Sequence, residues 1–179
     1  MNPLVIQMVG FLGMALCIGS YQIKSGRGLI LCKTAGDLVY VIHYLMLGAY
    51  SGCVTLFVGA VSQLACSCRG RYRWAEWKGW KWLFSGLLLA ACAVVWRNDF
   101  RPVPSLCAAI SMTSVILATW SGDPKVIRYG KLFVAGPAWL LYSVIVGSWS
   151  GILCELIGMA SAAIAVFRYR QNAVTKTQV

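Results

Sequence analysis

The sequence predicts an all-α membrane protein of seven transmembrane helices, in which a linker helix joins two parallel three-helix bundles in a 3+1+3 arrangement. Composition is the first reason: the 179 residues are 59% hydrophobic and only 12% charged, with a mean hydropathy of +0.71. That is too apolar for a soluble core of this size. Self-similarity is the second. Residues 1–72 align without a gap on the sequence 99 positions downstream, and this shift places Gly48 and Gly52 on Gly147 and Gly151. Such internal repeats decide architecture before any local signal does.

Seven apolar stretches are close to the length that a helix needs to cross about 30 Å of hydrocarbon. They are residues 4–20, 28–47, 50–68, 82–96, 103–120, 127–147 and 149–168. The fourth stretch is the shortest. Because no basic residue precedes the first stretch, we expect a retained span there and not a cleaved secretory signal.

These stretches divide the chain into four parts. Residues 1–72 form the first repeat, 73–99 an interfacial segment and the linker helix, 100–170 the second repeat, and 171–179 a short polar tail that we expect to be disordered and cytoplasmic. The segment 71–82 interleaves Trp and Tyr with Arg and Lys. In a soluble protein this composition suggests nucleic-acid binding, but next to a span it is typical of an interfacial anchor. We therefore expect the lipid bilayer, and no nucleic acid, as a partner.

The distribution of positive charge predicts the orientation. The net charge is +11, and fourteen of the sixteen basic residues fall in connections on one side of the predicted topology. Arg97 and Arg101 fall on the other side. Because cytoplasmic loops of membrane proteins are enriched in Lys and Arg, we expect the N-terminus outside and the C-terminus in the cytoplasm.

Cysteines and catalytic patterns give no sign of an enzyme. Nearly all of the eight cysteines lie in apolar stretches, where a free thiol behaves as a small hydrophobe. Cys66 and Cys68 are close in sequence but would not face one another on a helix. The sequence has no metal-spaced cluster, catalytic triad or phosphate loop. We predict no metal, no cofactor and no catalysis; an embedded enzyme would have to use Asp37, His43 and Glu155 alone.

Three stretches carry a family resemblance. The runs Val41–Tyr50, Arg101–Pro104 and Phe167–Arg170 resemble the YgjV family of bacterial inner-membrane proteins. That family looks like a relative of the SWEET and PQ-loop carriers, which share the 3+1+3 layout and move sugars and other small solutes. The resemblance implies an inner-membrane location and SWEET-like architecture. The chain departs from those carriers because it has no Pro-Gln pair in the first span of either repeat, and because Pro137 has Leu38 as its repeat partner.

Parallel repeats in transporters place the solute site near the midplane, where the repeats meet. We predict a small-solute transporter whose pocket is lined by polar and aromatic residues near that depth. They are Asp37, Tyr40, His43, Ser62, Gln63, Trp139, Tyr142, Glu155 and Ser161. The alternative is a non-transporting scaffold or accessory subunit, in which these residues only hold helices together. A homo-oligomer is compatible with the sequence.

Two acidic residues fall within predicted spans. Asp37 lies near the middle of its span, where an unpaired charge costs roughly 3 kcal/mol or more. Three interpretations stay open: an ion pair with Lys33, a wet pocket, or a protonated carboxyl. Glu155 and His43 are expected at similar depth, so a contact between them could relay protons. The alternative is a hydrogen-bonded histidine near a helix end.

Tyr40 and Trp139 are repeat partners near the predicted mid-membrane. Facing each other at the repeat axis, they would form a stacking platform for a ring-shaped solute. Aromatic packing between the bundles is the alternative interpretation. Pro137, two residues before Trp139, can open the helical hydrogen-bond ladder.

Overall fold

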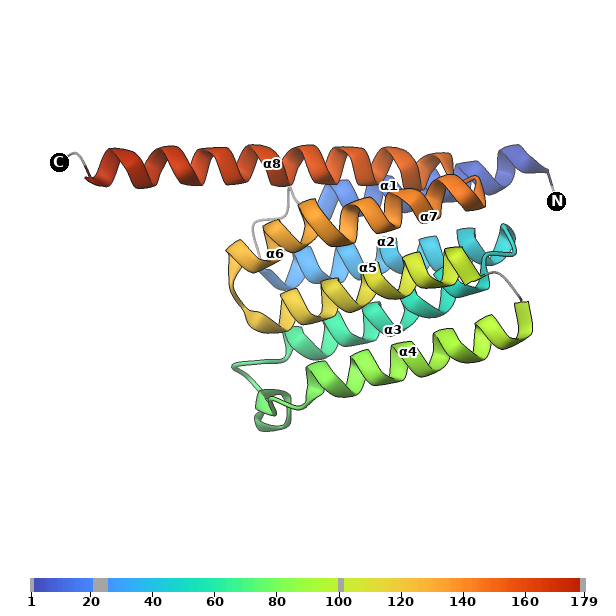
Figure 1. Cartoon of the computed structure of the whole chain (residues 1–179), viewed down its shortest axis with the longest axis horizontal. Helices are drawn as coiled ribbons and strands as arrows, with labels where there is room; N and C mark the ends of the chain where they lie inside the picture. The colour runs from blue at the N-terminus through green and yellow to red at the C-terminus, as the bar shows by residue number, and fades with distance from the viewer. Residues whose placement is uncertain (1, 21–25, 100–101, 178–179) are drawn as a thin grey trace.

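The computed structural model describes residues 2–20, 26–99 and 102–177. All regular structure in these ranges is helical, and the long helices lie roughly along one direction (Figure 1). The predicted all-α class is therefore confirmed. Lys24 and Arg101, two basic residues used to predict the orientation, lie outside the described ranges.

The helices follow the predicted spans closely. They are α1 (Pro3–Ser20), α2 (Gly26–Met46), α3 (Tyr50–Ser67), the short 3-10 turn η1 (Arg73–Glu76), α4 (Trp80–Asp99), α5 (Pro102–Ser121), α6 (Pro124–Gly130), the π-helical turn η2 (Lys131–Ala135), α7 (Gly136–Val146) and α8 (Trp149–Thr177). The elements α6, η2 and α7 follow one another as a single rod. α8 continues to Thr177, and residues 171–177 contain no Gly or Pro to end it.

The surface of the molecule is apolar and its interior is rich in small and polar residues. Large side chains such as Leu4, Phe133 and Trp149 are 72%, 67% and 65% exposed. Six of the described helices are long and apolar enough to cross a membrane. α2, which has 21 residues and carries Lys33 and Asp37, is not among these six. This distribution is expected when lipid surrounds the protein.

Two tight turns lie at the same end of the molecule, one between α2 and α3 and one between α7 and α8 (Figure 1). Each turn contains a glycine with left-handed backbone, Gly48 with φ 67° and Gly147 with φ 73°. In both turns the residue after the glycine donates its N–H to the carbonyl five positions earlier, at 2.8 and 2.9 Å. This arrangement closes a helix end, and only glycine adopts it without strain.

The opposite end carries η1, the α5–α6 turn and the end of α8 (Figure 1). Trp80 packs there against Trp74, Trp77 and Phe84, with ring centroids 5.5 to 5.9 Å apart. Its indole N–H donates to the Trp74 carbonyl at 2.8 Å. The connections at this end are basic, with Arg69, Arg71, Arg73, Lys78, Lys81, Lys125 and Arg128. Indoles and cations gathered at one end suit a membrane interface.

Helix α4 packs against α3 and α5 on the outside of the bundle (Figure 1). It covers the seam where α3 meets α5. Within this seam the Trp120 indole donates to the Ser62 hydroxyl at 2.9 Å, and Arg69 donates to the Trp120 carbonyl at 3.1 Å. On the other side the halves meet where α1 contacts α8.

Helices α1 and α2 approach closely at a glycine pair. A Cβ atom added at Gly36 would lie 2.6 Å from Cys17 Sγ, and 3.0 Å from both the Cys17 nitrogen and the Gly13 carbonyl oxygen. Two of these three neighbours are backbone atoms, which cannot rotate away. The closeness of α1 and α2 therefore depends on the missing side chain, as is common between membrane helices.

We expect Gly36→Ala to destabilise the protein by about 1–3 kcal/mol, because the added methyl group overpacks this contact. Gly86→Ala in α4 is the matched control, since nothing lies within 4 Å of a Cβ there. Thermal unfolding of the protein in detergent measures both. Equal unfolding temperatures for the two variants would contradict the close approach.

Candidate functional site

The centre of the molecule, where α2 faces α7, is filled by aromatic rings. Tyr44 is fully buried, and its ring lies 5.9, 5.8 and 5.4 Å from the rings of Tyr40, Trp139 and Tyr142. Its hydroxyl is 3.3 Å from the Ser143 hydroxyl. One of the two interpretations open from the sequence had Tyr40 and Trp139 facing each other, but Tyr44 packs against both rings and joins them. The aromatic packing interpretation fits this arrangement.

His43 is fully buried beside these rings. Its Nδ1 lies 2.8 Å from the Ile6 carbonyl and its Nε2 lies 2.8 Å from the Ser148 hydroxyl. A carbonyl can only accept, so in the neutral ring Nδ1 carries the proton and Nε2 accepts from Ser148. Both ring nitrogens thus have partners other than Glu155, and the hydrogen-bonded histidine, one of the two interpretations open from the sequence, fits this arrangement.

Two tyrosine hydroxyls bond to backbone carbonyls of the other half of the chain. The Tyr142 hydroxyl donates to the Ala49 carbonyl and the Tyr40 hydroxyl to the Ser150 carbonyl, both at 3.2 Å. We call this layer of buried, hydrogen-bonded side chains the aromatic seal. It consists of Tyr40, His43, Tyr44, Trp139, Tyr142, Ser143 and Ser148. It lies in the half of the molecule nearest the two glycine turns.

Asp37 is held by three helices. Lys33 Nζ is 2.7 Å from Asp37 Oδ2, Gln63 Nε2 donates to the same oxygen at 3.3 Å, and Cys17 Sγ lies 3.7 Å from Oδ1. The Lys33–Asp37 ion pair, one of the three interpretations open from the sequence, is confirmed. The pair is asymmetric, because the side chain of Lys33 is 29% exposed and that of Asp37 only 9%.

Glu155 makes a second ion pair, with Lys131 Nζ 2.5 Å from its Oε2. Lys131 opens the π-helical turn η2, where the Gly136 N–H bonds to the Lys131 carbonyl. Pro137 follows, and its missing N–H agrees with a ladder that opens nearby. Gly158 leaves room for the lysine, because a Cβ there would lie 3.2 Å from Lys131 Cε.

The two ion pairs lie on the same side of the aromatic seal. Asp37 is three residues before Tyr40 on α2, and Glu155 is five residues after Ser150 on α8. Since the Tyr40–Ser150 hydrogen bond fixes these helices at one depth and they run in opposite directions, both carboxylates lie toward the basic end. We call Lys33, Asp37, Lys131 and Glu155 the charged layer.

The structure does not bring every predicted residue to this centre. Gln63 contacts Asp37, but Ser62 bonds to Trp120 in the α3–α5 seam. Ser161 is exposed on α8. It lies six residues beyond Glu155, which is about 600° of helix rotation and therefore another face.

Several central residues were missed by the sequence analysis. Tyr44, Ser143 and Ser148 in the seal and Lys131 in the charged layer were not selected. The repeat alignment held a signal for the first two, because they lie 99 positions apart. Lys131 was interpreted only as a basic residue of the cytoplasmic side. It lies near the start of a predicted span, and its position within the membrane was not recognised.

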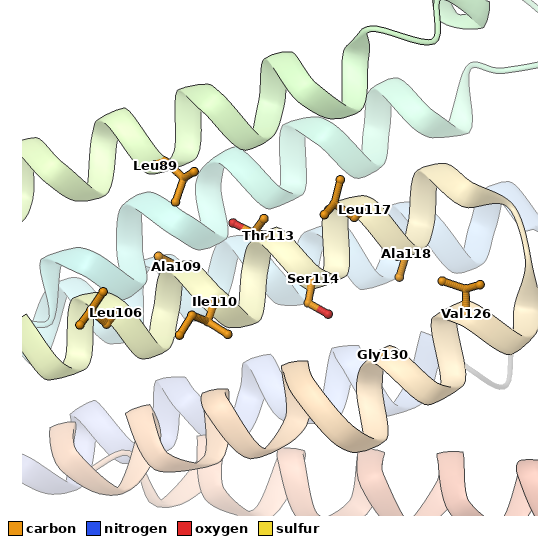
Figure 2. A pocket seen from close by; sticks show the side chains of 10 residues that line it. All are labelled: Leu89, Leu106, Ala109, Ile110, Thr113, Ser114, Leu117, Ala118, Val126 and Gly130. Carbon is orange, nitrogen blue, oxygen red and sulfur yellow. The ribbon is translucent and has the colours of Figure 1, made fainter.

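A cavity of about 540 Å³ lies elsewhere, between α4, α5 and α6 (Figure 2). Its lining is mostly apolar, with Leu89, Leu106, Ile110, Leu117 and Val126. None of the predicted site residues lines it. An open apolar groove on the outside of the bundle suits a lipid chain better than a polar solute.

The described residues hold no group of three His, Cys, Asp or Glu side chains placed to bind a metal. The eight cysteines are all free thiols, and three of them are buried. What the site offers is therefore hydrogen bonds, aromatic rings and two ion pairs.

Membrane-length apolar helices around a polar interior define a multi-pass membrane protein. The chain belongs to the Imp-YgjV family, described as bacterial inner membrane protein, whose sequence model matches residues 4–173. The family resemblance and the inner-membrane location predicted from the sequence are confirmed. No curated protein and no solved structure matches the chain.

Removing one partner of the second ion pair is expected to cost more than removing both. Lys131→Met leaves the buried carboxylate of Glu155 unpaired, which destabilises by about 3 kcal/mol, whereas the double variant Lys131→Met/Glu155→Leu stays within about 1 kcal/mol of the wild type. Unfolding in detergent measures both. A double variant as unstable as the single one would show that the pair itself holds the bundle together.

Proposed function

We propose that this protein moves a small polar solute across the inner membrane by alternating access. In this proposal α1–α3 and α5–α8 are two three-helix units of like orientation, and α4 is the linker, as in SWEET carriers. The observation that carries the proposal is the aromatic seal, whose hydrogen bonds join the two units, together with one buried ion pair in each unit on the basic side of the seal.

Reciprocal hydrogen bonds support the two-unit arrangement. His43 bonds to Ser148, and Tyr142 bonds to Ala49. A shift of 99 residues converts the first pair into the second, so each unit contributes one side chain and one turn. Tyr44 and Ser143, which are also 99 residues apart, touch each other. A pseudo-twofold axis along the membrane normal would produce such reciprocity.

Exposure of the two layers supports access from the basic end. The rings of Tyr44 and Tyr142 are fully buried, whereas the side chains of Lys33 and Lys131 are 29% and 31% exposed. The seal is held by neutral hydrogen bonds, each of which contributes only about 0.5–1.5 kcal/mol. A solute bound in the charged layer could therefore favour a conformation in which the aromatic seal is open and the basic end is closed. The π turn before Pro137 provides a place for α7 to bend.

The orientation of the protein in the membrane is part of the same proposal. Basic residues flank η1 (Arg69, Arg71, Arg73, Lys78 and Lys81) and lie in α6 (Lys125 and Arg128), whereas Arg97 lies at the far end of α4. Because cytoplasmic ends are enriched in Lys and Arg, the glycine turns face outward and the C-terminus lies inside.

A reporter fused after Val179 should be active in the cytoplasm, and one fused after Gly147 should be active on the outside, because α8 crosses the membrane between them. Alkaline phosphatase and a fluorescent protein, which report opposite sides, measure both fusions. The reverse pattern would overturn the orientation and leave the fold unaffected.

Proteoliposomes with a panel of labelled sugars, amino acids and organic acids test transport. We expect Asp37→Asn and Trp139→Ala each to lower flux by about tenfold or more, since each removes a contact worth at least about 1.4 kcal/mol at the centre. Phe57→Ala is the control, because Phe57 is 54% exposed on the lipid side of α3. Wild-type flux in both site variants would remove the site assignment.

The full burial of the aromatic seal favours a second candidate function, a non-transporting scaffold or accessory subunit. In that case Asp37→Asn lowers thermal stability, and the folded wild type moves no solute of the panel. Flux of any solute that depends on the wild-type protein excludes it.

A further inference from the structure

We propose that the charged layer is a binding site for a small anion, with one ammonium ligand from each unit, Lys33 and Lys131. We further propose that each anionic charge binds together with one proton, which is taken up by Asp37 or Glu155. This inference rests on the proposed function and names the class of solute.

The first argument concerns which charged groups a solute contacts first. In both pairs the lysine side chain is about three times as exposed as its carboxylate, 29% against 9% and 31% against 10%. Asp37 is further enclosed by Gln63 and Cys17. A solute that enters the layer reaches ammonium groups before carboxylates. This favours an anion over a cation, and over a zwitterion that needs an open carboxylate.

The second argument is that the two lysines occupy matching places. With a shift of 99 residues, Lys131 would correspond to Cys32. The π turn η2 holds about one extra residue compared with an α-helical turn, so residues before it match α2 at a shift of 98. At that shift Lys131 corresponds to Lys33. The backbone irregularity therefore turns a second ammonium group to the same face that Lys33 occupies in α2.

The carboxylates do not match in this way. The repeat partner of Asp37 is Gly136, and that of Glu155 is Leu56. One acid thus lies on the same helix as its lysine and the other on a neighbouring helix. The shared feature of the two units is the lysine, whereas the acid that neutralises it differs, as expected if the ammonium group is the ligand and the acid its counter-charge.

The third argument is charge balance. The charged layer is neutral, with two ammonium groups and two carboxylates. Adding an anion to a site of low dielectric constant is costly unless a negative charge is removed. A proton added to a carboxylate oxygen makes a neutral acid and releases the lysine to the anion, and no covalent bond of the solute changes. Among the described residues, the side chains on other elements that bond to the acids are Cys17 on α1 and Gln63 on α3 for Asp37, and Lys131 on η2 for Glu155. Of these, only Lys131 is charged.

Binding to the full-length protein in detergent tests the proposal without any flux measurement. The probes are succinate, inorganic phosphate, glucose, choline and glycine, followed by calorimetry and thermal shift. We expect succinate or phosphate to bind, with affinity rising about tenfold per proton taken up for each unit that the pH falls, and therefore about a hundredfold for an anion of two charges. Binding of succinate alone identifies a carboxylate solute and binding of phosphate alone a phosphate. Binding of glucose, choline or glycine without either anion overturns the proposal.

Variants separate a ligand from a structural ion pair. Lys131→Gln should weaken anion binding by about tenfold or more, Lys131→Arg should retain it, and Lys78→Gln, which changes an exposed lysine at the same end, should leave it unchanged. Glu155→Gln should bind the anion at least as tightly as the wild type and with a weaker pH dependence, because its counter-charge is gone. If Lys131→Gln does not fold, Lys33→Gln and Glu155→Gln carry the test. Loss of anion binding in Glu155→Gln, with the protein folded, contradicts the proposal.

The transport proposal and the anion-site proposal can be disproved independently of each other. Flux of a neutral sugar without anion binding would leave transport standing and remove the anion site. Anion binding without flux of any anion across proteoliposomes would keep the site and remove transport.

Discussion

The bilayer offers no water to polar groups, and this constraint shapes the whole molecule. A polar side chain within a span is stabilised by a hydrogen-bond or ion-pair partner inside the protein. Backbone groups are satisfied within the helices, and the side chains that cannot face lipid meet at the centre. The seal around Tyr44 and the two lysine–carboxylate pairs are the result. Leucine, valine and phenylalanine, which would fill the interior of a soluble protein, cover the outside instead.

The two ion pairs near the centre are built differently. Helix α2 is regular and carries both members of its ion pair four residues apart. The α6–α7 rod contains a π turn, and its lysine reaches a carboxylate on α8. One extra residue in a helical turn changes the direction in which the following side chains point, so α2 and the α6–α7 rod each place a lysine in a buried ion pair by different means. Gly158 and Gly136 make this arrangement sterically acceptable.

Contacts between residues close in the sequence could be predicted, whereas contacts between distant helices could not. The Lys33–Asp37 pair could be predicted, because residues four apart share a helix face. The contact of His43 with Glu155 was inferred from equal depth alone. Depth leaves the rotation of each helix undetermined, and His43 faces Ile6 and Ser148. Ser161 was placed at the centre for the same reason, but its side chain is exposed on α8.

The sequence alone determined the helices, their lengths, their apolar surfaces and the glycine turns, because these follow from composition, periodicity and backbone preferences within a few neighbouring residues. It also determined that Asp37 and Glu155 need partners, since bilayer energetics demands them. Only the tertiary structure decided that Tyr44 joins α2 to α7 and that Lys131 pairs with Glu155. Those contacts depend on how each helix is rotated against helices distant in sequence, and on a π turn that shifts the register of one rod. No local property of the chain specifies either.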